Sequence, residues 1–177
     1  MSSRNFPLPP LHRAAWLVLV GLPVCVVAAL LLPEPIRMPT PGWLLGPLFL
    51  LLLLVPLALL LRRRRIVVDG RTLKVAATFY TRNVDVDALD LAQARIVDLA
   101  EHTEYAPRLK LNGYDLPYFR AGHFLLRNRS RAFCLLTARD RVLVLPQRDG
   151  KLILLSPERP RDLLDHLRQL AAATPRR

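Results

Sequence analysis

The 177-residue sequence contains only two cysteines, Cys25 and Cys134. Two cysteines cannot build the disulfide framework that stabilises many small secreted proteins. Cys25 lies in a long apolar run and Cys134 in a short predicted strand, so the two cannot pair within one chain. Two free thiols fit a reducing cytoplasm. Cys134 stands between Phe133 and Leu135, and we interpret it as a small core residue, not as a nucleophile.

Motifs of catalysis and metal binding are also missing. The sequence has no glycine-rich phosphate loop, no nucleophile elbow and no His-Glu-x-x-His, and its four histidines lack the spacing of metal ligands. The nearest candidates for a metal site are the segment 101–104 and the aspartates Asp85, Asp87 and Asp90. We interpret the first as a solvated turn and the second as the outer face of a strand and turn. We therefore predict no catalytic residue, no metal site and no cofactor, and we do not expect an enzyme.

Arginine and long apolar runs are abundant. The chain has 26 Lys and Arg against 14 Asp and Glu, a formal charge of +12. Two windows of 19 residues, 14–32 and 43–61, contain no charged side chain. A helix of that length spans about 28 Å, close to the roughly 30 Å of a bilayer core. We predict a transmembrane helix over each window, joined by a short Pro-rich external loop over 33–42. A cleaved signal peptide is the alternative for 14–32, but no small-x-small site follows it.

Positive charge flanking the two spans predicts their orientation. Arg4 and Arg13 precede the first span and four arginines follow the second, whereas the connection carries only Arg37. By the positive-inside rule, both termini are expected in the cytoplasm. Residues 1–13 are then a cytoplasmic tail and 62–65 a basic juxtamembrane flank. The flank can contact anionic lipid headgroups or serve only to stop transfer; its residues are Arg62, Arg63, Arg64 and Arg65.

After the anchor, residues 66–173 form the predicted cytoplasmic domain, and 174–177 a tail. The run 73–80 alternates apolar and polar side chains, which is typical of a half-buried strand. Asp69-Gly70 is a hairpin-turn signal, and further short apolar runs are separated by polar turns about ten residues apart. This rhythm predicts an antiparallel sandwich or barrel. The chain then changes period: Ser156-Pro157-Glu158 is a helix-start signal, and leucines at helical spacing from Leu163 onward predict an amphipathic helix.

Strands followed by one helix resemble the pleckstrin-homology (PH) fold. The segment Asn112–Gly122, which reads NGYDLPYFRAG, is similar to the loop of bacterial PH-like domains in small membrane proteins; Phe124, Leu126, Pro146 and the segment 154–157 extend the likeness. Tyr118 stands where a glycine is expected in that family. The resemblance implies a membrane-anchored α+β protein: a two-helix transmembrane hairpin, then a PH-like antiparallel β-barrel or sandwich with a C-terminal amphipathic helix. It also implies a non-catalytic binding or scaffolding module, which we place in the bacterial inner membrane.

The loop Asn112–Gly122 is the first candidate for a partner surface. Tyr114, Tyr118 and Phe119 offer apolar contacts, and Arg120 a forked hydrogen-bond donor. The alternative is that the loop packs over the barrel, with its glycines as turns. A protein partner or a second copy of the chain is the expected ligand.

Charge distribution supplies a second candidate. Residues 66–104 carry four basic and seven acidic side chains, net −3, whereas 105–151 carry ten and three, net +7. One arginine-rich face of the domain can bind anionic lipid, an acidic protein segment or nucleic acid, or it is a solvated surface. The resemblance to the PH fold implies that a phosphoinositide headgroup would be held by basic residues on an extended loop between the first two strands, and here that connection is only the tight turn Asp69-Gly70-Arg71. A protein partner is therefore preferred, no nucleic acid is expected, and an anionic-lipid sensor is the alternative. The face is expected to comprise Arg120, Arg127, Arg129, Arg131, Arg139, Arg141 and Arg148.

Overall fold

The structure is a computed structural model that describes residues 3–9, 21, 24–25, 48–49, 52, 64–77, 80–116 and 119–173. Its first sheet has four antiparallel strands in the order β1-β2-β3-β4. They are β1 (Ser3–Phe6), β2 (Arg64–Asp69), β3 (Thr72–Ala77) and β4 (Tyr80–Asp85). Alternate residues of β2 and β3 are buried, as the period of two predicts.

The second sheet has six strands in the order β5-β9-β10-β8-β7-β6. They are β5 (Arg95–Val97), β6 (Pro107–Leu116), β7 (Phe119–Leu126), β8 (Arg131–Leu136), β9 (Val142–Pro146) and β10 (Leu152–Leu155). The sequence predicts an antiparallel sandwich or barrel, and this sheet departs from a purely antiparallel arrangement at one pair of strands. Strand β10 forms a hairpin with β9 and then inserts beside β8, to which it runs parallel. Both faces of β8 and β10 are buried, which explains their continuous apolar runs.

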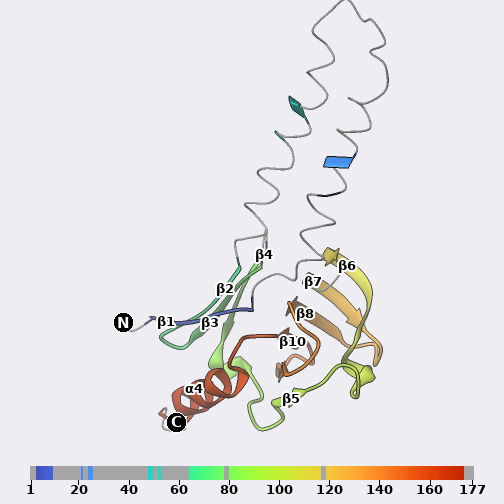
Figure 1. The fold of residues 1–177 in the computed structure, drawn as a ribbon. Helices are drawn as coiled ribbons and strands as arrows, with labels where there is room; N and C mark the ends of the chain where they lie inside the picture. The colour runs from blue at the N-terminus through green and yellow to red at the C-terminus, as the bar shows by residue number, and fades with distance from the viewer. Residues whose placement is uncertain are drawn as a thin grey trace, which may run out of the picture.

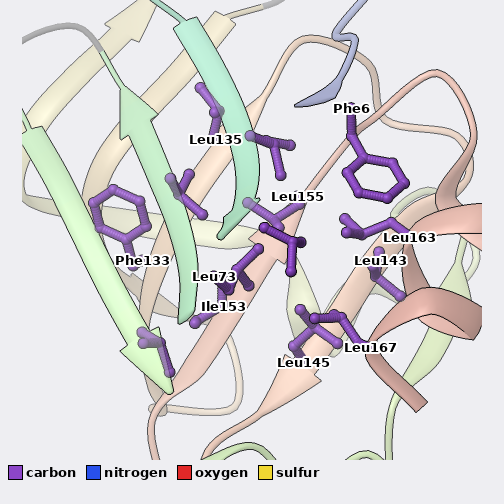
Figure 2. Close-up of a cluster of buried hydrophobic side chains, with 14 of the residues drawn as sticks. Phe6, Leu73, Phe133, Leu135, Leu143, Leu145, Ile153, Leu155, Leu163 and Leu167 are labelled. Atoms are coloured by element: carbon purple, nitrogen blue, oxygen red, sulfur yellow. The ribbon is translucent and has the colours of Figure 1, made fainter. Parts of the chain in front are cut away.

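The two sheets pack face to face as a sandwich, and a helix lies against one end of it (Figure 1). Side chains from both sheets and from the helix meet in one apolar core, with Phe6 beside Leu163 (Figure 2). A second buried cluster lies on the other face of the six-stranded sheet, where Tyr105 and Leu152 pack against it. Tyr105 belongs to the short 3₁₀ helix η4 (Thr103–Tyr105); another, η3 (Val86–Ala88), follows β4.

The C-terminal helix α4 (Pro160–Ala172) begins four residues after the predicted start signal at Ser156. Ser156 is buried, and its Oγ accepts a hydrogen bond of 2.7 Å from the backbone N–H of Thr137. Pro160 instead occupies the first helical turn, where a missing N–H costs nothing. Leu163 and Leu167 are fully buried, as the leucine spacing predicts.

Strand β1 is the main feature that the sequence did not predict. It lies within the segment 1–13, which was expected to be a tail, and it pairs antiparallel with β2 so that Phe6 faces Ile66. Phe6 is 6% exposed and its ring lies 5.9 Å from that of His166 on α4. The carbonyl of Pro7 then accepts a hydrogen bond from the N–H of Glu158. The N-terminal strand is therefore part of the sandwich core.

The two predicted membrane spans fall almost entirely outside the described residues. Among the residues that the structure does describe, no helix is both long and apolar enough to cross a membrane.

Candidate functional site

The segment Asn112–Gly122 forms the end of the β6–β7 hairpin, and two of its glycines lie directly opposite each other. Gly113 pairs with Gly122 at backbone φ values of +152° and +124°. A Cβ added to Gly113 would lie 2.2 Å from the carbonyl oxygen of Ala121, and one added to Gly122 would lie 2.4 Å from that of Asn112. The two strands approach too closely here for any side chain, so the glycines of this motif have a structural role.

Phe119 starts β7, and its ring is buried in the core at 1% exposure. It is therefore not part of the accessible surface that a partner can contact. The guanidinium of Arg64 lies 5.5 Å from the centroid of this ring. Because Arg64 belongs to the predicted juxtamembrane flank, this contact places the base of β7 next to the point where β2 begins.

Arg64 is itself unusual among the arginines. Its Nε and Nη1 atoms are buried, and neither has a hydrogen-bond acceptor among the described residues. Burial lowers the pKa of Arg64 from its ordinary value. The face of an aromatic ring offsets part of this cost through a cation–π interaction. Arg65, the next residue, is exposed, and Arg62 and Arg63 lie outside the described residues.

The other predicted contact residues of the hairpin have different surroundings. Tyr114 is half-buried and packs at the margin of the core; burial, and then the nearby Tyr80, raise its pKa. Arg120 is 27% exposed and pairs with Asp115 across the hairpin at 2.7 Å. Tyr118 lies outside the described residues. The accessible part of this predicted surface in the structure is therefore the edge of Tyr114 and the Arg120–Asp115 pair.

The seven arginines expected on one face lie at two opposite ends of the six-stranded sheet. Arg127, Arg129 and Arg131 lie in or beside the β7–β8 turn, and Arg148 follows β9 at the same end. Arg139 and Arg141 lie in the β8–β9 connection at the other end, where Arg120 faces Leu136. One continuous arginine face is thus not formed, because the strand β8 separates the two groups.

Two candidates considered in the sequence analysis, Cys134 and Asp87, lie in the core and in an ion pair, respectively. Cys134 is fully buried, which raises the pKa of its thiol above its ordinary value. Asp87 forms an ion pair with Arg71 on the neighbouring hairpin. Within the described residues, no group of three His, Cys, Asp or Glu side chains has a geometry that could hold a metal ion.

A site that the sequence analysis missed lies where the sandwich opens. A hollow of about 190 Å³ there is lined by five apolar residues and by five polar residues, which lie in or next to β4, β7, β8, β9 and β10. The polar residues are Arg82, His123, Arg131, Gln147 and Lys151. Only the pairing of distant strands brings these residues together. Arg131 was predicted as part of the arginine-rich face and Arg82 was not singled out, and nothing in their spacing indicated a shared cavity.

The fold and the hairpin motif agree with the comparison to protein families. Residues 64–171, more than half of the chain, match the model of the bacterial PH domain, and the chain belongs to that family. No curated protein and no solved structure matches the chain. The family match begins at residue 64, where β2 starts. Strand β1 therefore lies outside the matched residues, although it pairs with β2 in the structure.

Proposed function

We propose that this protein is an integral membrane protein of the bacterial inner membrane, which presents its PH domain to the cytoplasm for protein interaction or scaffolding. The single observation that carries this proposal is the pairing of β1 with β2. These strands flank the segment that contains both predicted spans, residues 14–32 and 43–61. Phe6, the last residue of β1, and Ile66, the third residue of β2, are partners in one ladder.

Because β1 and β2 are antiparallel neighbours, the chain between them leaves the domain and returns to it at the same end of these two strands. If the apolar windows insert in a bilayer, the chain must therefore cross an even number of times. Two windows of spanning length satisfy this condition. The arginine distribution independently favours the cytoplasmic side for both ends. Membership in the bacterial PH domain family supports a binding module over an enzyme.

Under this proposal, the contact between Arg64 and Phe119 indicates which part of the domain lies nearest the membrane. It holds the β6–β7 hairpin beside the juxtamembrane flank. A partner that contacts Tyr114, Tyr118 or the Arg120–Asp115 pair would therefore bind close to the membrane surface. A second membrane protein, or a second copy of this chain, meets that requirement.

Cysteine accessibility tests the topology. In a variant lacking Cys25 and Cys134, single cysteines are placed at Ser3, in the connection at Thr40, and at Arg177. We expect a membrane-impermeant maleimide added to spheroplasts to label position 40 only, and to label all three positions after lysis. Labelling of position 3 or 177 in intact spheroplasts would contradict the proposal. Photocrosslinking from position 118 then tests for a protein neighbour, and a surface position on α4, Gln169, serves as the matched control.

An anionic-lipid sensor is the second candidate, favoured by Arg64, whose buried Nε and Nη1 atoms have no hydrogen-bond acceptor among the described residues, and by the exposed Arg65 beside it. A phosphodiester is an acceptor that Arg64 lacks among the described residues. The full chain in nanodiscs should be tested, because a fragment starting at residue 66 would lack β1. If phosphatidylglycerol raises the melting temperature of the wild-type protein but not of Arg64→Gln, the lipid reading is supported. Equal melting temperatures in neutral and anionic nanodiscs would remove it.

A further inference from the structure

At the open end of the sandwich, polar side chains occupy positions that continue the inward-facing apolar rows of the strands. Along a strand, alternate residues face the same side, so an inward-facing row normally stays apolar. On β8 the row Leu135, Phe133 continues to Arg131, and on β10 the row Leu155, Ile153 continues to Lys151. Cations therefore stand at the ends of core-facing rows.

Three further strands also have a polar residue in their inward-facing row at this end of the sandwich. Phe119 and Ala121 of β7 are followed in the same row by His123, and Leu143 and Leu145 of β9 by Gln147. On β4, Arg82 stands between Tyr80 and the buried Val84. His123 confirms the inward direction, because its ring lies 5.2 Å from the ring of Phe133 in an edge-on arrangement. Five strands thus contribute polar side chains to one mouth.

The mouth is electropositive. No carboxylate lines the hollow of about 190 Å³ that these residues border. No ion pair joins Arg82 or Arg131 to a carboxylate of the described residues, whereas Lys151 pairs with Asp149 at 2.6 Å. Arg82 acts on two neighbours, although it is not the main cause in either. Burial, and then Arg82, lower the pKa of His123, and hydrogen bonds from Lys151, with a smaller effect of Arg82, lower the pKa of Asp149.

A second hollow of about 440 Å³ shares Arg82 and Gln147 with the first and is lined by four consecutive β4 residues, 82–85. Its charged lining residues are Arg82, Arg148, Asp85 and Asp149, and Asp149 is the carboxylate that pairs with Lys151. Strand β4 is also an edge strand: among the described residues, β3 is its only partner. The two hollows together carry more cationic than acidic side chains, and a free strand edge beside them fits an extended segment better than a compact ligand.

We infer that these two hollows, which together we call the β4 trough, bind an extended acidic polypeptide segment of a partner protein. The segment lies along β4, and its carboxylates accept hydrogen bonds from Arg82 and Arg131. Charge complementarity identifies the occupant, because Arg82 and Arg131 form no ion pair among the described residues and the edge of β4 beside them has no strand partner there. Apolar side chains, among them Leu111 and Leu152, line the same hollow and can contact the non-acidic residues of such a segment. This inference deepens the proposed function: it rests on that function and names the chemistry of the partner.

The test uses the full chain in a neutral detergent and a short fluorescein-labelled peptide of alternating glutamate and threonine. We expect saturable binding that weakens as salt is raised, and an affinity about tenfold lower for the matched peptide with glutamine in place of glutamate. The double variant R82Q/R131Q should lose about tenfold in affinity for the glutamate peptide. The control R139Q/R141Q removes the same charge at the opposite end of the sheet and should bind like wild type.

Equal affinity for the two peptides, or equal loss in both double variants, overturns the inference. Displacement of the peptide by inorganic phosphate at constant ionic strength also overturns it, because the mouth would then be a compact oxyanion site. Melting temperatures of both double variants exclude a folding defect. If the trough fails this test but the crosslinks from position 118 persist, the proposed function stands without it. If no protein neighbour is found by crosslinking, the proposed function itself fails.

Discussion

Phe6 and Ile66 face each other on adjacent strands, although the two predicted membrane spans separate them in the sequence. Both side chains are buried in the same core, and Phe6 also contacts α4 through His166. The N-terminus is therefore held by apolar packing and by a backbone ladder with β2.

Replacing Phe6 with alanine should destabilise the whole domain. The ring is almost fully buried between β2 and α4, so its loss leaves a cavity, and we expect a cost of about 3 kcal/mol. Thermal unfolding of the full chain measures the change. Asn5→Ala is the control, since Asn5 is exposed on the same strand and should leave the melting temperature unchanged. Equal melting temperatures for the two variants would show that β1 contributes nothing to the core.

The Gly113–Gly122 pair should not tolerate a methyl group at either position. In Gly113→Ala the new Cβ would collide with the backbone of β7, and the residue would also have a positive φ, so we expect a cost of about 3 kcal/mol. Gly70→Ala isolates the second effect. Gly70 has a φ of +58° but open space around it, so the cost should be about 1 kcal/mol. If both variants unfold at the same denaturant concentration, steric contact across the hairpin is not what the motif preserves.

Ser156→Ala should weaken the junction between β8 and α4. The hydroxyl of Ser156 accepts a hydrogen bond from the backbone N–H of Thr137, and both groups are buried, so the variant leaves an unsatisfied donor. We expect a loss of about 1–3 kcal/mol in the free energy of unfolding. Ser130→Ala, at a half-buried turn position, provides a comparison that should change little. Unaltered stability in Ser156→Ala would mean that water replaces the hydroxyl.

Stability should fall as the pH drops below about 6.5, the ordinary pKa of histidine. Burial is the largest cause that lowers the pKa of both His123 and His166, with nearby Arg82 and Arg4 as the second causes. A lowered pKa means that the unfolded chain binds protons more readily than the folded one. The stabilisation is therefore complete above the unfolded pKa and is lost as the pH falls through the folded pKa.

Melting temperatures measured between pH 8 and 5 test this expectation (the range brackets the histidine pKa of about 6.5). The double variant H123Q/H166Q should show a flatter profile than wild type over the same interval. His102→Gln is the control, because His102 is exposed in a turn beside Glu104. A profile for H123Q/H166Q as steep as that of wild type would assign the pH dependence to other groups.

Local patterns in the sequence predicted much of this fold. The alternation in 73–80 identified β3, and the leucine spacing after Leu163 identified the buried face of α4. The prediction of one strand through residue 80 was wrong, because β3 ends at Ala77 and Tyr80 begins the antiparallel strand β4. The hairpin motif led to the bacterial PH domain family. These signals are local, because each depends on residues that neighbour one another within one strand, helix or turn.

Features that depend on distant pairing were not predictable in this way. Strand β1 has only four residues and becomes a strand through β2, far along the chain. The parallel pairing of β8 with β10 depends on where a hairpin inserts, which an apolar run does not encode. The arginines were predicted as one face, but their distribution over two ends of the sheet follows from strand direction. The β4 trough combines five strands and has no local pattern at all.

The β1–β2 ladder also changes what counts as one unit of this protein. The folded body is assembled from two stretches of chain, with the hydrophobic stretch inserted between them. Excising everything before residue 64 would therefore not trim a dispensable leader. It would strip a strand from the sheet, open the edge of β2 to other chains, and leave the helix without one of its aromatic neighbours.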